Sequence, residues 1–115
     1  MRRGEIYWAD LLPRSGAEQT GRRPVILVSA DGFNQTAGWR SVLVVPMSTS
    51  ITQARRGPTV VEIPRGVAGL SKTSIAVCHQ VTTLDRAKLT KRIGTLPADL
   101  IADLGSGLKA ALDLD

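Results

Sequence analysis

Apolar residues occur along the chain in short alternating or continuous runs. The segment 3–12 alternates loosely and places Ile6, Trp8 and Leu11 at apolar positions. Alternation of this kind predicts a half-buried first strand. The further predicted strands, in chain order, are 24–29, 41–47, 59–63, 74–78 with 81–84 (one broken strand or two short ones) and 89–95. The pattern therefore predicts a domain built mainly from β-strands.

Prolines and polar segments predict where these strands begin and end. Pro24 is predicted as the first residue of its strand, where a missing N–H is tolerated, and Pro46 is predicted to end a ladder or to mark an edge or bulge. The polar segments 13–23 and 48–58 are predicted as loops, and 30–40 as a loop or a short helical turn. Long ordered loops in small domains are often functional.

The segment 97–112 is the one clear helix. Pro97 suits a first helical turn, and Ile101, Leu104 and Leu108 recur at spacings of three or four on one face, which 111–112 continues. Two glycines inside the segment, Gly105 and Gly107, each cost about 1 kcal/mol relative to alanine. They predict either close packing or a break in the helix. Several short strands closed by this helix favour a small, strongly bent, barrel-like sheet.

Composition indicates a soluble globular protein. The 115 residues fit a single domain, 1–115, and 43% of them are hydrophobic. No apolar stretch is long enough to cross a membrane, and none resembles a signal peptide. The lone cysteine, Cys78, lies in an apolar run and is predicted to be a buried, inert thiol. A reducing, cytoplasmic location is therefore expected.

The charge balance favours a polyanionic partner. The net charge is +5, and the excess lies in residues 1–58, which carry eight basic and four acidic side chains. Nucleic acid and an acidic protein segment both fit this balance, although many small basic proteins bind neither.

Several kinds of catalytic site are excluded by residue type. His79 is the only histidine, which excludes a pair of catalytic histidines and zinc sites of the HExxH type. The carboxylates of the first half are scattered singly along the chain, whereas a two-metal nuclease site requires several carboxylates close together. Phosphate-binding glycine loops are also missing from the sequence. We therefore expect neither a metal nor a cofactor.

Polar side chains flank two of the predicted buried strands. Arg22 and Arg23 precede the strand that starts at Pro24, and Ser48 and Thr49 follow the next strand along the chain. RNA supplies its own nucleophile, the 2′-hydroxyl, so an enzyme needs only to align it and to stabilise the charged phosphorane. A guanidinium and a hydroxyl at neighbouring strand ends can do this. Each motif taken alone is more typical of a solvated loop or a turn.

The order of several short segments is more specific than any single motif. They are RGEIY (3–7) with Asp10 and LLP (11–13), GAEQ (16–19), GRRPVILVS (21–29), DGFN (31–34), VVPMS (44–48), LSKTS (70–74), QVTTLD (80–85), IG (93–94) and LP (96–97). In this order they resemble the MazF/PemK family of toxin ribonucleases over nearly the whole chain.

The resemblance implies a fold, an activity and partners. The implied fold is a mainly β, SH3-like barrel of the PemK/CcdB type with a C-terminal α-helix, and the implied assembly is a homodimer. Such proteins cut single-stranded RNA at short preferred sequences without metal, leaving a 2′,3′-cyclic phosphate and a 5′-hydroxyl. An acidic antitoxin protein is the implied second partner.

The resemblance also assigns roles to residues. Arg23 matches the family's catalytic arginine, and Ser48 matches its catalytic threonine or serine. The expected substrate-binding residues are Glu18, Arg22, Thr49, Gln80 and Trp39. Because free arginine has a pKa above about 12, phosphorane stabilisation is the favoured role of Arg23, with proton transfer as the alternative.

Four further residues leave alternatives open. Thr82 stands where the family often has arginine, and His79 where it often has an acidic residue. Trp39 and Phe33 could stack on bases or fill the core, and for Phe33 the core is favoured. Two other functions compete with RNA cleavage: a toxin of the same fold that binds and inhibits DNA gyrase, and a catalytically dead relative that only regulates.

Overall fold

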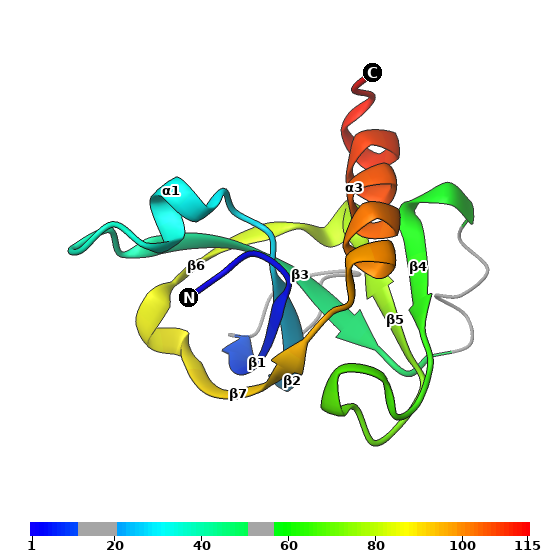
Figure 1. Cartoon of the computed structure of the whole chain (residues 1–115), viewed down its shortest axis with the longest axis horizontal. Helices are drawn as coiled ribbons and strands as arrows, with labels where there is room; N and C mark the ends of the chain where they lie inside the picture. Colours follow the sequence, from blue (N-terminus) through cyan, green and yellow to red (C-terminus); the bar gives the residue numbers. More distant parts are fainter. Residues whose placement is uncertain (12–20, 51–56) are drawn as a thin grey trace.

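Antiparallel strands account for most of the fold, shown in Figure 1. The computed structural model describes residues 1–11, 21–50 and 57–115. Its strands are β1 (Glu5–Leu11), β2 (Gly21–Leu27), β3 (Ser41–Ser48), β4 (Val60–Ile63), β5 (Ser74–Val77), β6 (Thr82–Asp85) and β7 (Leu89–Thr95). Its helices are α1 (Asp31–Asn34) and α3 (Ala98–Leu112), with single 3₁₀ turns η1 (Gly57–Thr59), η2 (Val67–Gly69), η3 (Cys78–Gln80) and η4 (Arg86–Lys88). No helix within the described ranges is long and apolar enough to span a membrane.

The strands pair in the order β4-β5-β3-β2-β1-β7, and β6 also pairs with β3. One edge of β3 therefore contacts β2, and the other contacts β6 and then β5. Pro46 lies where the partner on this second edge changes. The irregularity predicted at Pro46 is thus present, but it lies in the strands that pair with β3, where η3 separates β5 from β6. The predicted broken strand over 74–84 is confirmed.

The two ends of the sheet approach each other through backbone contacts between β7 and η2. A Cβ atom added to Gly94 would overlap the carbonyl oxygen of Ala68, and one added to Gly69 would lie 2.6 Å from the carbonyl oxygen of Ile93. Real side chains do not tolerate such separations, so glycine is required at both positions for the strands to come this close. The sheet is therefore strongly bent, as the pattern of short strands predicted (Figure 1).

Helix α3 covers one side of the bent sheet and runs unbroken through both of its glycines. A Cβ atom on Gly107 would lie 2.7 Å from the sulfur of Cys78, so this glycine provides close packing rather than a helix break. Cys78 is fully buried beneath the helix, and burial raises the pKa of its thiol to about 11. The prediction of a buried thiol is confirmed, and a raised pKa fits the expected low reactivity, since thiolate is the reactive form.

Strand β2 begins earlier than the sequence predicted. It starts at Gly21, so Arg22 and Arg23 belong to the strand and Pro24 lies inside it, opposite Trp8 of β1. Pairing with β1 extends to the Leu11–Gly21 pair. The start of β2 is paired with β1, but its residues are polar and exposed. It therefore shows no alternation of apolar and polar positions, and the sequence pattern does not reveal it as part of the strand.

A buried carboxylate connects the chain start, β1 and β7. Glu5 is 6% exposed and accepts hydrogen bonds from the backbone N–H of Arg2 (2.6 Å), from the Tyr7 hydroxyl (3.0 Å) and from the Arg92 guanidinium (2.9 Å). Burial alone raises the pKa of this carboxyl, but the three donors together bring the pKa below its usual value. Burial, together with the bond to Glu5, raises the pKa of Tyr7 to about 12.

The Glu5 carboxylate makes the free energy of unfolding depend on pH. A depressed folded-state pKa contributes stability above the unfolded value of 4.5, and this contribution is lost as the pH falls through 4.5 toward the folded value. We expect Glu5→Gln to lower the free energy of unfolding by about 1–2 kcal/mol near neutral pH, and by less near about pH 3.5. Urea unfolding of both proteins at the two pH values measures this. An unchanged difference would show that Glu5 titrates alike in both states.

Candidate active site

A groove of about 480 Å³ runs past the start of β2. Its lining residues come from β1, β2, the residue after β3, the stretch from the end of η2 to the start of β5, and β7. They are Trp8, Arg22, Arg23, Pro24, Thr49, Gly69, Leu70, Ser71, Lys72, Ser74 and Ile93. Three of these are cationic, and none of the described lining residues is acidic. The groove is therefore suited to an anionic ligand.

Strand register relates the positions of Arg23 and Ser48. The antiparallel pairing of β2 with β3 ends at Val25 opposite Pro46, and the same register continued by two residues would bring Arg23 opposite Ser48. Because side chains alternate along a strand, Arg23 shares the face of Val25, and Ser48 shares that of Pro46. Directly opposite Cβ atoms in such a pair are about 4.5–5.5 Å apart.

The two side chains differ in exposure and in their hydrogen-bonding capacity. Arg23 is exposed and lines the groove, whereas Ser48 is half-buried at the end of β3 and lies beside the lining residues. The Ser48 hydroxyl oxygen accepts a hydrogen bond from the backbone N–H of Ser50 at 3.1 Å. That bond leaves the hydroxyl hydrogen to be donated to a phosphate oxygen. Arg23 thus lines the groove, and Ser48 precedes Thr49, another of its lining residues.

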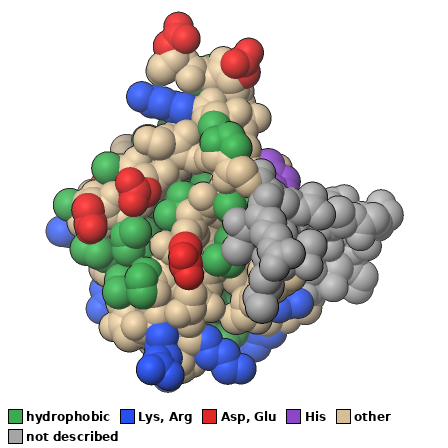
Figure 2. Space-filling view, turned by 90° about the vertical axis from the view of Figure 1, so that its right-hand side faces the viewer, with side chains coloured by type: hydrophobic (Ala, Val, Ile, Leu, Met, Phe, Trp, Pro, Cys, Tyr) green, Lys and Arg blue, Asp and Glu red, His purple; other side chains and the backbone are tan. Residues whose placement is uncertain are grey.

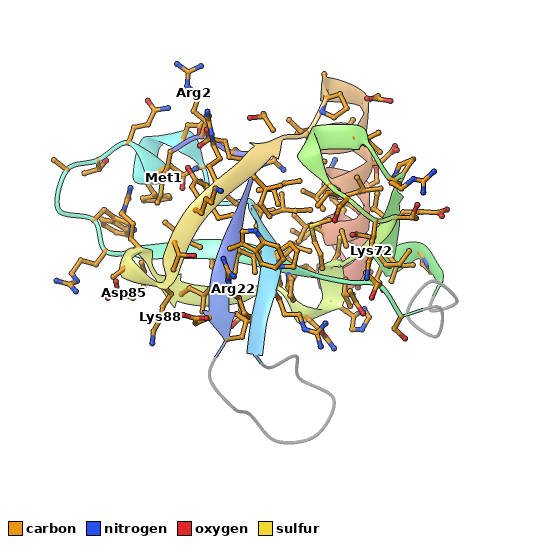
Figure 3. The ribbon with its side chains drawn as sticks, turned by 90° about the horizontal axis from the view of Figure 1, so that it is seen from below. Met1, Arg2, Arg22, Lys72, Asp85 and Lys88 are labelled. Atoms are coloured by element: carbon orange, nitrogen blue, oxygen red, sulfur yellow. The ribbon has the colours of Figure 1, made fainter. Side chains whose placement is uncertain are left out.

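Arg22 lies against an aromatic ring on the other face of the same strand. Its guanidinium carbon is 4.7 Å from the ring centroid of Trp8, a cation–π contact. In the view from below, Arg22 and Lys72 are seen on β2 and on the segment leading to β5 (Figure 3). Lys and Arg side chains also gather along the lower edge of the side view, while acidic side chains lie higher and near the end of α3 (Figure 2). All charged residues among the described lining of the groove are basic.

The structure places Trp39 away from this groove. Its ring packs on Phe33 with centroids 5.0 Å apart, between α1 and β3, and lines two other hollows of about 280 and 730 Å³. Neither hollow shares a lining residue with the groove at Arg23. The expectation that Phe33 fills the core is wrong: it is 49% exposed, and it pairs with Trp39 on the surface. The helical turn it belongs to has only four residues, and Asn34 is its buried member.

The remaining candidates lie elsewhere or cannot be placed. Gln80 is half-buried at the end of η3, its Oε1 atom is buried, and it does not line the groove. His79 is exposed, and its Nδ1 atom lies 2.8 Å from the Thr59 hydroxyl. Thr82 is half-buried in β6, opposite Val44. Glu18 falls outside the described residues.

Two groove residues were not singled out from the sequence. Trp8 reads as an ordinary apolar position of an alternating strand, and alternation does not tell which apolar residues border a groove. Lys72 stands in the LSKTS segment, which carried the resemblance without a role. A basic residue next to two serines or threonines was the available signal for a phosphate contact.

Comparison with known protein families gives a match over nearly the whole chain. Residues 2–112 match the family described as PemK-like, MazF-like toxin of type II toxin–antitoxin system. The chain is 36% identical over 112 residues to endoribonuclease MazF2 of Mycobacterium bovis, covering 97% of this chain and 96% of that protein. The same values hold for endoribonuclease MazF6 of Mycobacterium tuberculosis.

Solved structures share the fold. The Mycobacterium tuberculosis toxin MazF-mt6 superposes with a TM-score of 0.78 at 26% identity, covering 96% of this chain and 98% of that one. The MazE–MazF complex of Deinococcus radiodurans (Form-II) gives a TM-score of 0.74 at 25% identity, covering 100% and 97%. The barrel with its C-terminal helix is therefore the architecture of these toxins.

Proposed function

Because the chain belongs to the PemK-like, MazF-like toxin family of type II toxin–antitoxin systems, we propose that it is an endoribonuclease toxin that cuts single-stranded RNA at the groove of Arg23. The observation that carries this proposal is the cationic groove that Arg23 lines, at the end of the β2–β3 pairing whose continued register would bring Ser48 opposite Arg23. Curated relatives with matching length are named endoribonucleases, which supports the same activity.

The proposed reaction is attack of the RNA 2′-oxygen on its own phosphorus. The 2′-hydroxyl gives its proton to water as the 2′,3′-cyclic phosphate forms, the bond from phosphorus to the 5′-oxygen breaks, and the leaving 5′-oxygen takes up a proton from water. Arg23 holds two phosphate oxygens through its planar fork and stabilises the negative charge of the phosphorane. Ser48 donates its hydroxyl hydrogen to the phosphate. No metal takes part in this scheme.

The proposal includes the protein's partners and location. An acidic antitoxin is the second partner, in keeping with the solved toxin–antitoxin complexes of Deinococcus radiodurans and with the net charge of +5. The working form is a homodimer in the cytoplasm. Because the antitoxin contact is electrostatic, added salt should weaken it.

Incubating the purified protein with single-stranded RNA in EDTA tests the function. We expect internal cleavage, with 2′,3′-cyclic phosphate and 5′-hydroxyl ends identified by end-mapping. Cleavage that needs an added divalent ion would overturn the metal-free scheme. Intact RNA together with inhibited DNA gyrase would replace the function by the gyrase-binding alternative.

A further inference from the structure

The groove contains an aromatic ring that the cleavage scheme does not use. Trp8 is half-buried in β1, and it is paired with Pro24, the residue next to Arg23. It forms one wall of the groove, while Ser71 and Lys72 contribute to the lining from the segment before β5. The Arg22 guanidinium lies over its ring face. A ring that borders an anion-binding groove beside the candidate catalytic arginine needs a role of its own.

We propose that Trp8 is the stacking platform for one base of the RNA and that Arg22 covers it in the unbound protein. On binding, the guanidinium leaves the ring for a phosphate oxygen, and a base takes its place. This inference rests on the proposed function, because it names the part of the RNA that the groove holds together with the cleaved bond.

The magnitudes favour this exchange. An exposed cation–π contact contributes about 0.5–1 kcal/mol, whereas stacking of a base on an aromatic side chain contributes about 1–3 kcal/mol. Arg22 does not lose its partner in the exchange, because a phosphate offers it a charge-assisted bidentate contact. Replacing the cation by a base therefore strengthens both contacts.

The lining of the groove relates the ring to the candidate catalytic arginine. Trp8 lies opposite Pro24 and so shares a face with Pro24 and Arg22, whereas Arg23 belongs to the other face of β2. All four residues nevertheless line one groove, which therefore passes around the start of β2. We place the stacked base in the same stretch of RNA as the cleaved phosphate, and Lys72 lines the groove where it can contact a further phosphate.

An acidic peptide could also displace Arg22 from the ring, and the experiment separates these two ligands. The chain has two tryptophans, so the Trp39→Phe protein reports Trp8 fluorescence alone. Its probes are a 2′-O-methyl oligouridylate, which cannot be cleaved, an abasic sugar–phosphate oligomer of the same length, and oligoglutamate. We expect the oligouridylate to quench Trp8 and the other two to leave it unquenched.

The outcomes are distinct. Quenching by the base-bearing oligomer alone supports the stacking platform. Equal quenching by the abasic oligomer would show that phosphate merely removes Arg22, and quenching by oligoglutamate would assign the ring to a peptide. Binding of the oligouridylate without any quenching would also overturn the proposal. None of these readouts requires cleavage, so failure of the ribonuclease function is detected separately in the EDTA assay.

Substitutions at the ring give a second test. Trp8→Leu is expected to raise KM for RNA cleavage about 5- to 100-fold, the range that corresponds to one lost stacking contact, and to change kcat little. Trp8→Phe keeps a stacking face and is expected to stay within about threefold of the parent KM. Equal losses in the two variants would indicate a packing role, because only the stacking role distinguishes phenylalanine from leucine.

Discussion

Replacing Arg23 with alanine is expected to lower the single-turnover rate of RNA cleavage by at least about 10²–10³-fold, the usual effect of removing one donor that stabilises transition-state charge. The guanidinium would act on charge that develops only in the phosphorane, so the loss falls mainly on kcat and less on KM. Arg23 is exposed in β2, so we expect the fold to persist when its side chain is shortened.

One matched variant separates charge from geometry, and two further variants test whether Arg23 and Ser48 act together. Arg23→Lys keeps the positive charge but loses the planar fork, and it should recover only part of the rate. Ser48→Ala should slow cleavage as well, and the double variant should lose less than the product of the two single effects, because both groups act on one phosphate. Circular dichroism and the urea midpoint check folding. An Arg23→Ala protein that cuts RNA at the parent rate would remove this residue from the mechanism.

The sequence predicted the order of the elements better than their edges. β7 and α3 were located well, because polar residues and Pro97 mark their boundaries clearly. The start of β2 was placed three residues too late, because Arg22 and Arg23 are exposed and pair through backbone bonds that leave no sign in the side-chain pattern. Where such a strand begins depends on how far the strand beside it continues the pairing.

The candidate site also depends on contacts between distant segments that the local sequence does not reveal. The types of residue at Arg23 and Ser48 suggested phosphate chemistry, but their adjacency depends on β2 pairing with β3, which no local pattern contains. Trp8 stands out only as an apolar position of an alternating strand. The core was favoured for Phe33, which lies on the surface with Trp39. Whether a given apolar residue faces the core or a groove is set by the bend of the sheet, and that bend comes from contacts between distant segments.

Replacing Gly94 with alanine is expected to lower the free energy of unfolding by about 2–4 kcal/mol, at the upper end for one added methyl group in a packed site. Gly94 lies in β7 opposite Ile6, and its φ is not in the left-handed region, so the substitution tests space alone. The atom that blocks the new Cβ is the backbone carbonyl oxygen of Ala68, which cannot rotate away as a flexible side chain could. The two ends of the bent sheet must therefore separate.

Separation at this point also affects the groove, because Ala68 leads directly into the segment of Gly69 and Lys72 that forms one of its walls. We therefore expect Gly94→Ala to weaken RNA binding more than it slows the chemical step at Arg23. Urea unfolding and oligonucleotide titration measure the two effects. Gly105→Ala is the matched control: its Cβ meets only the end of the Arg3 side chain at 3.9 Å, so alanine in the helix should stabilise by up to about 1 kcal/mol. If both variants unfolded at the parent urea concentration, the contact between β7 and η2 would not hold the barrel closed.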